Sequence, residues 1–394
     1  MPRYELAGDT WQIEQTDEQL AITSAGKTTI RKFRTPEQAA VQLVKLVDER
    51  VAAGYLPTLE PRHAALEAAI ASDPDDPIAY AVYADWLQSQ GDPRGAMIAH
   101  QLAAAATGDA KLAASFAKEL ARHAAYLLGP LARIAGELQW RFGFIRRASL
   151  SVEHHAPIDE MLETLLRHPS ARFLFELLLV GHDRMQQAVA IAERLAPASL
   201  RTLRLLSVDH LDATSLTASL VQLRRLSMSG RGLVLGELAL PALEILQVSD
   251  TAPTAATSRA LARAELPALR ELSLDFGDAF HSGDASIDDI FEMMQRPAFP
   301  ALSSLALRNT RYSREVILEL ATSPWAAQLT SLDLAYNHMT DAHALSLVGH
   351  RAKFPRLAHL EVSYNELSDA SLSALTALCP DVRSQRQNVA LARR

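Results

Sequence analysis

Apolar and polar positions alternate in short, regularly spaced segments over most of the C-terminal half of the chain. In the clearest segment, Leu329–Asn337, leucines occupy the first, fourth and sixth positions and asparagine the ninth. Leu357–Asn365 has the same order, with valine at the sixth position. Positions four and six lie between polar neighbours, so they point to one face of a short β-strand. The asparagine suits a turn, because its side chain can bond backbone groups that are otherwise unpaired.

This spacing recurs and predicts nine strands. One such unit cannot bury its apolar face alone, whereas a stack of units can. The order L-x-x-L-x-L-x-x-N resembles the leucine-rich repeat. For residues 141–394 the resemblance implies an α/β fold, a leucine-rich-repeat solenoid (a horseshoe) with a parallel sheet on its concave face. The units begin at Ile145, Leu174, Leu200, Leu223, Leu243, Leu269, Leu302, Leu329 and Leu357.

The intervals between these strands predict the structure of the opposite, convex side. The longest intervals contain three amphipathic segments, 286–294, 313–320 and 340–348, and each begins with a serine or threonine that can cap a helix. We expect a helix in each of them. The middle units are too short for a full helix and predict turns or 3₁₀ segments.

Residues 1–58 predict a small α+β module. Two alternating segments, Trp11–Ile13 and Thr28–Phe33, predict strands, with a turn at Ser24–Lys27 between them. A helix is expected from Pro36, because proline suits the first helical position and the preceding threonine can cap it. The expected module is a small sheet with one helix packed on it.

The same segment is similar to a WGR domain, a module found in poly(ADP-ribose) polymerases and in many bacterial proteins. The similarity rests on the early tryptophan, the Ala-Gly-Lys turn at residues 25–27, Phe33 and a closing Gly-Tyr pair at residues 54–55. In the polymerase branch the module contacts DNA. Here Gln19–Ala21 stands where the family carries its Trp-Gly-Arg triplet, so the aromatic and basic groups that suit a nucleic-acid end are missing. The Ala-Gly-Lys turn also suggests a phosphate loop, but the strand expected after it replaces the helix that such a loop requires.

Residues 60–140 predict helices. Three motifs, at residues 70–76, 83–87 and 91–95, resemble the bacterial repeat-companion domain, a helical segment found next to repeat arrays without an assigned activity. Asp85 and Arg94 in these motifs are candidates for a catalytic or ligand pair, or for a structural pair or cap at a turn beside a core of Tyr83 and Trp86. We favour the structural role, because buried or capping charges are usually structural. The alanine-rich run from 96 to 135 favours further helices, which we expect to cap the end of the solenoid.

Composition narrows the class of protein. At 394 residues the chain is too long for one ordinary compact core, and its formal net charge of −7 gives no support to a strongly nucleic-acid-seeking surface. The single cysteine, Cys379, excludes an internal disulfide and fits a reducing compartment. The first residues lack the apolar run of a signal peptide, and no stretch is apolar enough for a membrane helix. We therefore expect a cytoplasmic bacterial protein that does not contact a membrane.

The third, fifth and seventh positions of each unit point out of the concave face and are the candidate binding positions. Short side chains dominate there, which predicts an accessible and fairly flat surface rather than a small-molecule pocket. Basic side chains lie towards the N-terminal end and acidic ones towards the C-terminal end, a polarity that suits a protein partner of complementary charge. The predicted partner-binding residues are Arg204, Arg225, Gln247, Glu271, Asp275, Arg308, Asp333, His359 and Glu361.

The sequence gives little support to catalysis or metal binding. The spacing of the histidines does not bring them together on one metal, and Cys379 has no basic neighbour in sequence that would activate it. We predict a non-catalytic scaffold or adaptor for a protein partner, without catalytic residues, cofactor or metal. The alternatives are a nucleic-acid-associated regulator acting through the WGR-like module, and an enzyme with a cryptic site at Cys379 or the histidines. The histidines concerned are His154, His155, His338, His343 and His350.

Overall fold

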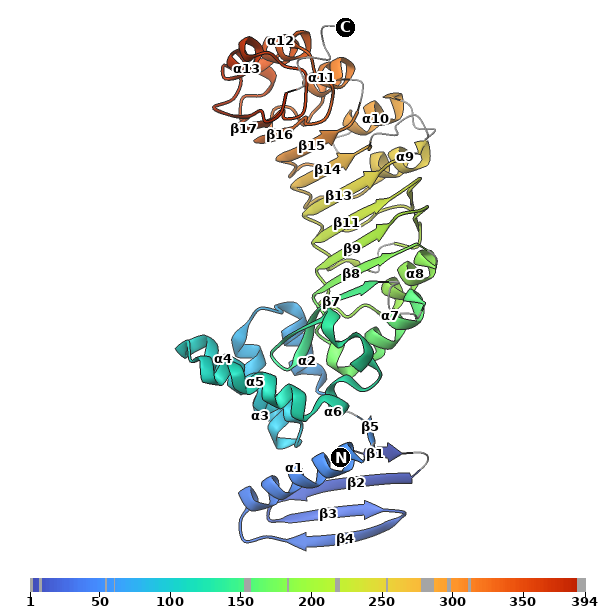
Figure 1. Ribbon diagram of the computed structural model, residues 1–394, viewed down its shortest axis with the longest axis vertical. Coiled ribbons are helices and arrows are strands. Elements are labelled where there is room, and N and C mark those ends of the chain that lie inside the picture. The colour runs from blue at the N-terminus through green and yellow to red at the C-terminus, as the bar shows by residue number, and fades with distance from the viewer. Residues whose placement is uncertain are drawn as a thin grey trace. The chain divides into compact units, whose positions relative to one another are not determined.

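The structure is a computed structural model of the 394-residue chain. It describes residues 3–6, 9–53, 55–59, 61–151, 157–182, 184–216, 220–252, 254–277, 287–295, 299–310 and 313–387. The chain forms two compact units (Figure 1). The first contains residues 1–149, 163–176 and 197–199, and the second contains residues 150–162, 177–196 and 200–394.

The first unit begins with an antiparallel five-stranded sheet in the order β4-β3-β2-β1-β5, covered by one helix. Its core joins Trp11, Ile13 and Leu20 of the sheet to Leu43 and Val47 of the helix. The predicted sheet with one helix is confirmed, although three of its strands, β1, β3 and β5, were missed. The elements are β1 (Arg3–Leu6), β2 (Asp9–Thr16), β3 (Gln19–Ser24), β4 (Lys27–Lys32), α1 (Pro36–Ala52) and β5 (Leu56–Leu59).

The Ala-Gly-Lys segment is a hairpin turn. Ala25 (φ 49°) and Gly26 (φ 76°) both lie in the left-handed region, which suits the tight turn between β3 and β4. Strand β4 follows at once, so the backbone lacks the strand–loop–helix order of a phosphate loop. The predicted hairpin is therefore confirmed. Gly54, which contributed to the WGR resemblance, lies outside the described residues.

Helices, together with the antiparallel pair of strands β6 and β7, form most of the rest of the first unit, and aspartates start three of the helices. Asp76, Asp92 and Asp109 accept hydrogen bonds from backbone N–H groups at the first turns of α3, α4 and α5, as good N-cap residues do. The elements are α2 (Ala64–Ser72), α3 (Pro77–Ser89), α4 (Pro93–Thr107), α5 (Ala110–Arg122), α6 (Ala124–Leu128), the 3₁₀ segment η1 (Gly129–Glu137), β6 (Leu138–Arg141), β7 (Phe144–Ser151), α7 (Ile158–Arg167) and η3 (Pro169–Ala171). The last residues of β7 and the first half of α7 belong to the second unit.

Arg94 lies fully buried among these helices. Its guanidinium donates to Asp92 Oδ2 at 3.0 Å, to the Tyr126 hydroxyl at 3.3 Å and to Ser170 Oγ at 2.8 Å. The predicted pair with Asp85 is wrong, because Asp85 is exposed and Asp92 is the carboxylate that binds Arg94. Asp92 also caps α4, so one carboxylate serves the helix start and the buried charge. The structural role that we favoured for Arg94 is confirmed.

A second buried cluster ties residues 163–176 to the helices. Arg172 donates to Glu67 Oε1 at 3.1 Å and to the Tyr83 hydroxyl at 2.8 Å. Burial alone would raise the pKa of Glu67, but hydrogen bonds from Arg62 and the charge of Arg172 outweigh it, so the pKa lies below its usual value. Trp86, predicted in the core, is half-buried and stacks on Tyr83 with ring centroids 5.5 Å apart.

His168 makes the first unit sensitive to pH. Burial lowers its pKa from 6.5 to about 4, and the charges of Arg94 and Arg172 act in the same direction. His168 is therefore protonated below about pH 6.5 in the unfolded chain but only below about pH 4 in the folded unit. The free energy of unfolding of the first unit falls as the pH is lowered through this window. We expect a loss of about 2 kcal/mol between pH 7 and pH 4.5. Denaturant titrations of wild type and His168→Asn should show this slope only in wild type, and equal slopes would contradict it.

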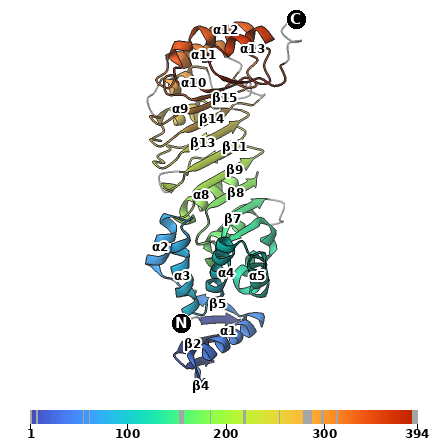
Figure 2. The same cartoon turned by 90° about the vertical axis from the view of Figure 1, so that its left-hand side faces the viewer.

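The second unit contains a large parallel sheet in the order β8-β9-β11-β13-β14-β15-β16-β17-β18. Neighbouring strands from β9 to β18 pair in parallel and in the register that the repeats predict. Figure 2 shows the strands stacked one above another. They are β8 (Glu176–Gly181), β9 (Thr202–Ser207), β11 (Arg225–Gly230), β13 (Ile245–Asp250), β14 (Glu271–Asp275), β15 (Ser304–Arg308), β16 (Ser331–Asp333), β17 (His359–Glu361) and β18 (Asp381–Arg383).

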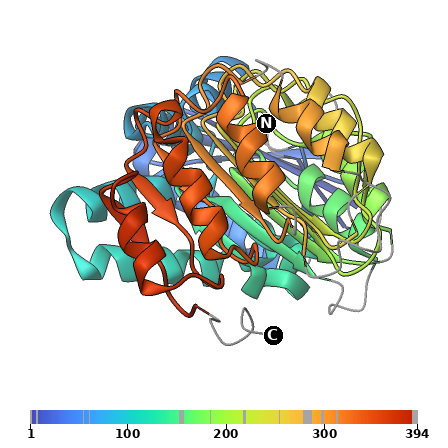
Figure 3. The same cartoon turned by 90° about the horizontal axis from the view of Figure 1, so that it is seen from above.

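Helices connect most of these strands, and the helices from α9 to α13 pack against one another in chain order (Figure 3). The three helices predicted in the long intervals are confirmed as α10, α11 and α12, although Ser286, the expected cap of α10, lies outside the described residues. The two shortest repeats, which begin at Leu200 and Leu223, carry the two-residue strands β10 (Asp212–Ala213) and β12 (Val234–Leu235). The remaining elements are α8 (Met185–Leu195), α9 (Ala255–Arg263), α10 (Ile287–Met294), α11 (Ser313–Thr322), α12 (Asp341–Gly349), η6 (Arg351–Lys353) and α13 (Asp369–Leu375).

Buried amides join the last units of the sheet. Asn337 Oδ1 accepts the backbone N–H of Thr310 at 2.8 Å, and its Nδ2 donates to Leu307 O at 2.7 Å. Asn365 repeats the arrangement one unit later, accepting the N–H of Asn337 at 2.9 Å. Gln387 extends the series, because its Nε2 donates to Val362 O, in the same repeat as Asn365, at 2.8 Å. The predicted turn role of these asparagines is confirmed.

Several elements of the second unit departed from expectation, because helices α8 and α13 were not predicted and strand β18 and helix α9 were missed. Strand β18 was missed because its unit lacks the leucine pattern: Cys379 takes the first apolar position and Val382 the fourth. Helix α9 was missed because its unit is shorter than those with predicted helices, although Thr254 caps it by accepting the N–H of Thr257. Within the described residues, no helix has the length and apolar character needed to cross a membrane.

Candidate functional site

The outward side chains of the second unit form continuous rows across the parallel sheet, which we call the strand face. Position three is occupied in register by Thr202, Arg225, Ile245, Glu271, Ser304, Ser331, His359 and Asp381. Along each strand these side chains are partly or fully exposed, while the alternating apolar ones are buried. The structure therefore places all nine predicted binding residues on one face, as the alternation implied.

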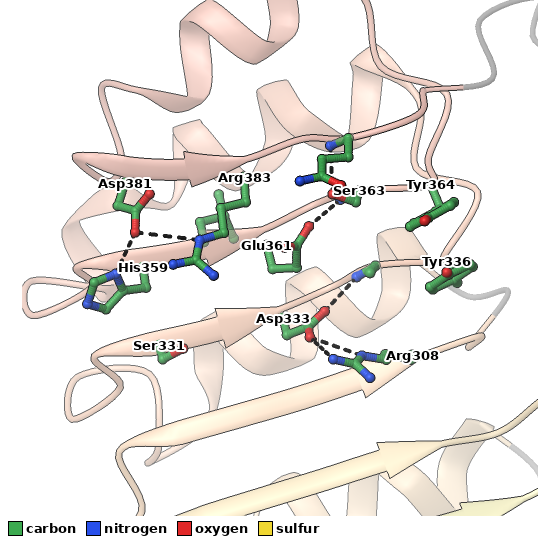
Figure 4. A pocket seen from close by; sticks show the side chains of 13 residues that line it. Arg308, Ser331, Asp333, Tyr336, His359, Glu361, Ser363, Tyr364, Asp381 and Arg383 are labelled. Carbon is green, nitrogen blue, oxygen red and sulfur yellow. Dashed lines mark hydrogen bonds and ion pairs between the residues drawn. The ribbon is translucent and has the colours of Figure 1, made fainter.

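The predicted residues fall into two groups on the strand face. Arg204 and Arg225 lie on β9 and β11, and Gln247 on β13 donates to Glu271 Oε1 on β14 at 3.2 Å. Towards the other end, the face is hollowed by a depression of about 670 Å³ over β15 to β18 (Figure 4). The predicted flat surface is therefore wrong at this end. The side chains that line the hollow are Arg308, Ser331, Asp333, Ala335, Tyr336, His359, Leu360, Glu361, Ser363, Tyr364, Asp381, Arg383 and Gln385.

Small side chains explain the depression. Ser331, Ala335 and Ser363 are small residues at outward positions of β16 and β17 and the turns after them, and the longer side chains of Arg308, His359 and Gln385 stand around them, so space is left between these longer side chains. The long side chains come from adjacent strands, which hold them at fixed spacing. The hollow is therefore a consequence of side-chain size on a regular sheet.

The acidic groups of the hollow are bonded inside the protein. Asp333 accepts both the guanidinium of Arg308, at 3.0 Å from Nε, and the backbone N–H of Ala335 at 2.9 Å. Glu361 accepts the N–H of Ser363 at 2.7 Å. The hydrogen bond to Asp333 raises the pKa of Arg308, and the charge of Asp333 acts in the same direction. The predicted acidic end is therefore an arrangement of paired charges rather than bare carboxylates.

Strand β18 adds two charged residues that the sequence reasoning missed. Asp381 accepts a hydrogen bond from the ring of His359, with Nδ1 and Oδ2 2.8 Å apart. Arg383 lies 3.9 Å from the same carboxylate and is mostly exposed. The signal in the sequence was the Asp-Val-Arg alternation after Cys379, which continues the spacing of the preceding units.

Tyr336 and Tyr364 form the second missed feature. Their rings stack with centroids 4.3 Å apart and an interplanar angle of 9° (Figure 4). Both lie at the eighth position of their units, where φ is 61° and 58° and the backbone is left-handed. The signal was the Tyr-Asn pair that ends both of the clearest repeats.

The histidines lie apart in separate structural contacts. His343 Nδ1 accepts the backbone N–H of Thr340 at 2.9 Å in a capping box, and burial lowers its pKa. His338 lies 3.2 Å from Glu366, and His350 contacts the carbonyl of Ser346 at 2.8 Å. In the part of the chain that the structure describes, no group of three His, Cys, Asp or Glu residues could hold a metal. His154 and His155 lie outside the described residues.

Cys379 is buried, with 1% of its surface exposed, and burial raises the pKa of its thiol. A neutral, covered thiol is a poor nucleophile. We expect iodoacetamide at pH 8 to alkylate Cys379 at least about 100-fold more slowly in the folded protein than in urea. Mass spectrometry of timed samples measures both rates. Equal rates would contradict the burial and revive Cys379 as a reactive group.

These observations define a mixed α/β protein with a large, mostly parallel sheet. A crystal structure of a protein from Bacteroides fragilis is similar, with a TM-score of 0.52 over 98% of this chain and 97% of that chain. The two sequences are 15% identical, so this likeness shows the fold alone. No protein-family model matches the chain, and no curated protein sequence matches it.

Proposed function

We propose that this protein is a non-catalytic scaffold or adaptor that binds a protein partner through the strand face. The observation that carries the proposal is the register of the parallel sheet, which aligns outward side chains into one extended surface. Extended surfaces of stacked units are what repeat proteins use for binding. The same register and the buried asparagines support a leucine-rich-repeat solenoid for residues 141–394.

The charges on the strand face support an oriented partner. Arg204 and Arg225 lie on β9 and β11, whereas Glu271 and Asp275 lie on β14. A partner with the opposite order of charges gains attraction in one orientation and repulsion in the other.

In the first unit, the observed sheet and helices support assignment of residues 1–58 as WGR-like and 60–140 as repeat-companion.

The test compares two triple variants with the same change in charge. The strand-face variant carries Arg204→Glu, Arg225→Glu and Glu271→Lys. The control carries Arg263→Glu, Arg314→Glu and Glu237→Lys, at exposed positions on α9, on α11 and after β12, outside the strands of the parallel sheet. Each is immobilised and exposed to native lysate, and retained proteins are quantified by mass spectrometry.

We expect wild type and the control to retain the same partner and the strand-face variant to lose it at least tenfold. Reversal of charge at the centre of an interface converts attraction into repulsion, while the same change elsewhere leaves the contact intact. Equal retention by all three proteins would contradict the strand face as the binding surface. Thermal melting of each variant shows that the folds are comparable.

A further inference from the structure

The hollow over β15 to β18 holds more negative than positive charge near Arg308. The pKa of Arg308 is raised first by its hydrogen bond to Asp333, and the charges of Asp333, Asp275 and Glu361 add to the shift. Three carboxylates thus act on one guanidinium. A second guanidinium, that of Arg383, also lines the hollow, opposite Glu361 in register and 3.9 Å from Asp381. The lining nevertheless has three carboxylates, Asp333, Glu361 and Asp381, against two guanidinium groups, and this surplus favours a further cation from outside.

The hydrogen bonds leave acceptor capacity at this position. Glu361 uses Oε1 for the N–H of Ser363, and Asp275 uses Oδ1 for Gly277 and for the side chain of Asn309. Among the residues that the structure describes, no donor is hydrogen-bonded to the second oxygen of either carboxylate, Oε2 of Glu361 or Oδ2 of Asp275. A carboxylate can accept several hydrogen bonds, so each retains acceptor positions for a ligand. Of the two, Glu361 lines the hollow.

The stacked tyrosines supply an aromatic surface beside these carboxylates. Asn309, Tyr336, Tyr364 and Arg386 occupy the eighth position of four successive units, and all have left-handed φ values between 51° and 61°. The guanidinium of Arg386 already lies over the Tyr364 ring, 5.8 Å from its centroid. Tyr336, at the other end of the stack, is 42% exposed. The protein itself therefore shows that a guanidinium fits against this stack.

We propose that the hollow binds an arginine side chain of the protein partner, with the guanidinium against Tyr336 and paired with Glu361. Arginine suits the site better than lysine because its planar group stacks on an aromatic ring while its N–H groups bind a carboxylate. An acidic segment suits it poorly, because it would face the surplus negative charge. This inference rests on the proposed binding of a protein by the strand face and names the chemistry of one contact.

The test uses N-acetyl-arginine amide as the probe and N-acetyl-glutamate amide as its opposite. The protein has eight tyrosines, so labelling with fluorotyrosine gives a small set of ¹⁹F signals. Tyr336→Asn removes one signal and so assigns it. Asparagine suits this left-handed position, because Asn309 occupies the same position of the preceding repeat with a φ of 59°. Glu361→Gln removes the charge and keeps an acceptor for Ser363, and Glu237→Gln makes the same change away from the hollow.

We expect the arginine probe to shift the Tyr336 and Tyr364 signals saturably and the glutamate probe to leave them unchanged. Glu361→Gln and Tyr336→Asn should each weaken arginine binding at least about tenfold, and Glu237→Gln should leave it unchanged. Equal response to both probes, unchanged affinity in Glu361→Gln, or absence of shifts would overturn the proposal. Loss of a partner with the strand-face triple variant but not with Glu361→Gln would overturn this inference and leave the proposed function standing.

Discussion

Arg94→Ala is expected to lower the free energy of unfolding of the first unit by about 3–5 kcal/mol. The reason is the environment of its guanidinium, which is fully buried and bonded to Asp92, Tyr126 and Ser170. Removing one partner of a buried ion pair leaves the other charge in a poorly solvating interior. Asp92 would keep its cap on α4 but lose the cation that neutralises it.

The measurement is hydrogen exchange of the amides in α3 and α4 at increasing denaturant concentration. Because both helices belong to the first unit, their exchange reports the free energy of unfolding of that unit alone. The matched control is Arg167→Ala, because Arg167 is 61% exposed and forms an ordinary helical pair with Glu163 at 2.8 Å. We expect that control to cost less than about 0.5 kcal/mol. Equal losses for both variants would show that the buried network contributes no more than a surface ion pair.

Asn365→Leu should destabilise the end of the parallel sheet by about 3 kcal/mol. The amide of Asn365 accepts the N–H groups of Asn337 and Met339 at 2.9 and 3.0 Å and donates to the carbonyls of Leu334 and Val362 at 3.0 and 2.9 Å. Leucine matches its size but leaves these backbone groups unpaired in a buried place.

Hydrogen exchange of β15 to β17 measures this loss, together with the denaturant midpoint of the second unit. Ser331→Ala is the control, because Ser331 lies on the strand face of the same units and is only partly buried. It should change stability by less than about 0.5 kcal/mol. Unchanged exchange in Asn365→Leu would contradict the buried amide series as the link between units.

Alternation predicted the strands of the second unit well because a buried apolar side chain, leucine in most repeats, stands at the fourth and sixth positions. It also placed Arg308, Asp333, His359 and Glu361 on one face, since strand register fixes the side of every residue. The same reasoning failed for β18, where cysteine and valine replace leucine. It failed for Asp85, because sequence proximity to Arg94 does not reveal which of several aspartates turns towards it.

The hollow could not be predicted from outward positions alone. Its depth depends on small side chains at Ser331, Ala335 and Ser363 in neighbouring strands, and its aromatic side on Tyr336 and Tyr364. These tyrosines follow the strands, where a left-handed backbone sets their direction. Periodicity predicts which side of the sheet a residue within a strand faces, but it does not predict the side-chain direction of a residue in the turn after the strand. The pairing of Arg308 with Asp333 likewise needs two strands side by side.

The central claim is that the strand face contacts the partner. Hydroxyl-radical footprinting of the protein with and without the retained partner tests it most directly. Leu206 occupies the outward seventh position of its repeat on β9, opposite Ser229 on β11. The account predicts lower modification of Leu206, Tyr336 and His359, and unchanged modification of Leu345 on α12 and Ile30 on β4, which are 59% and 60% exposed. Protection of Leu345 or Ile30, with the strand face still fully reactive, would contradict it.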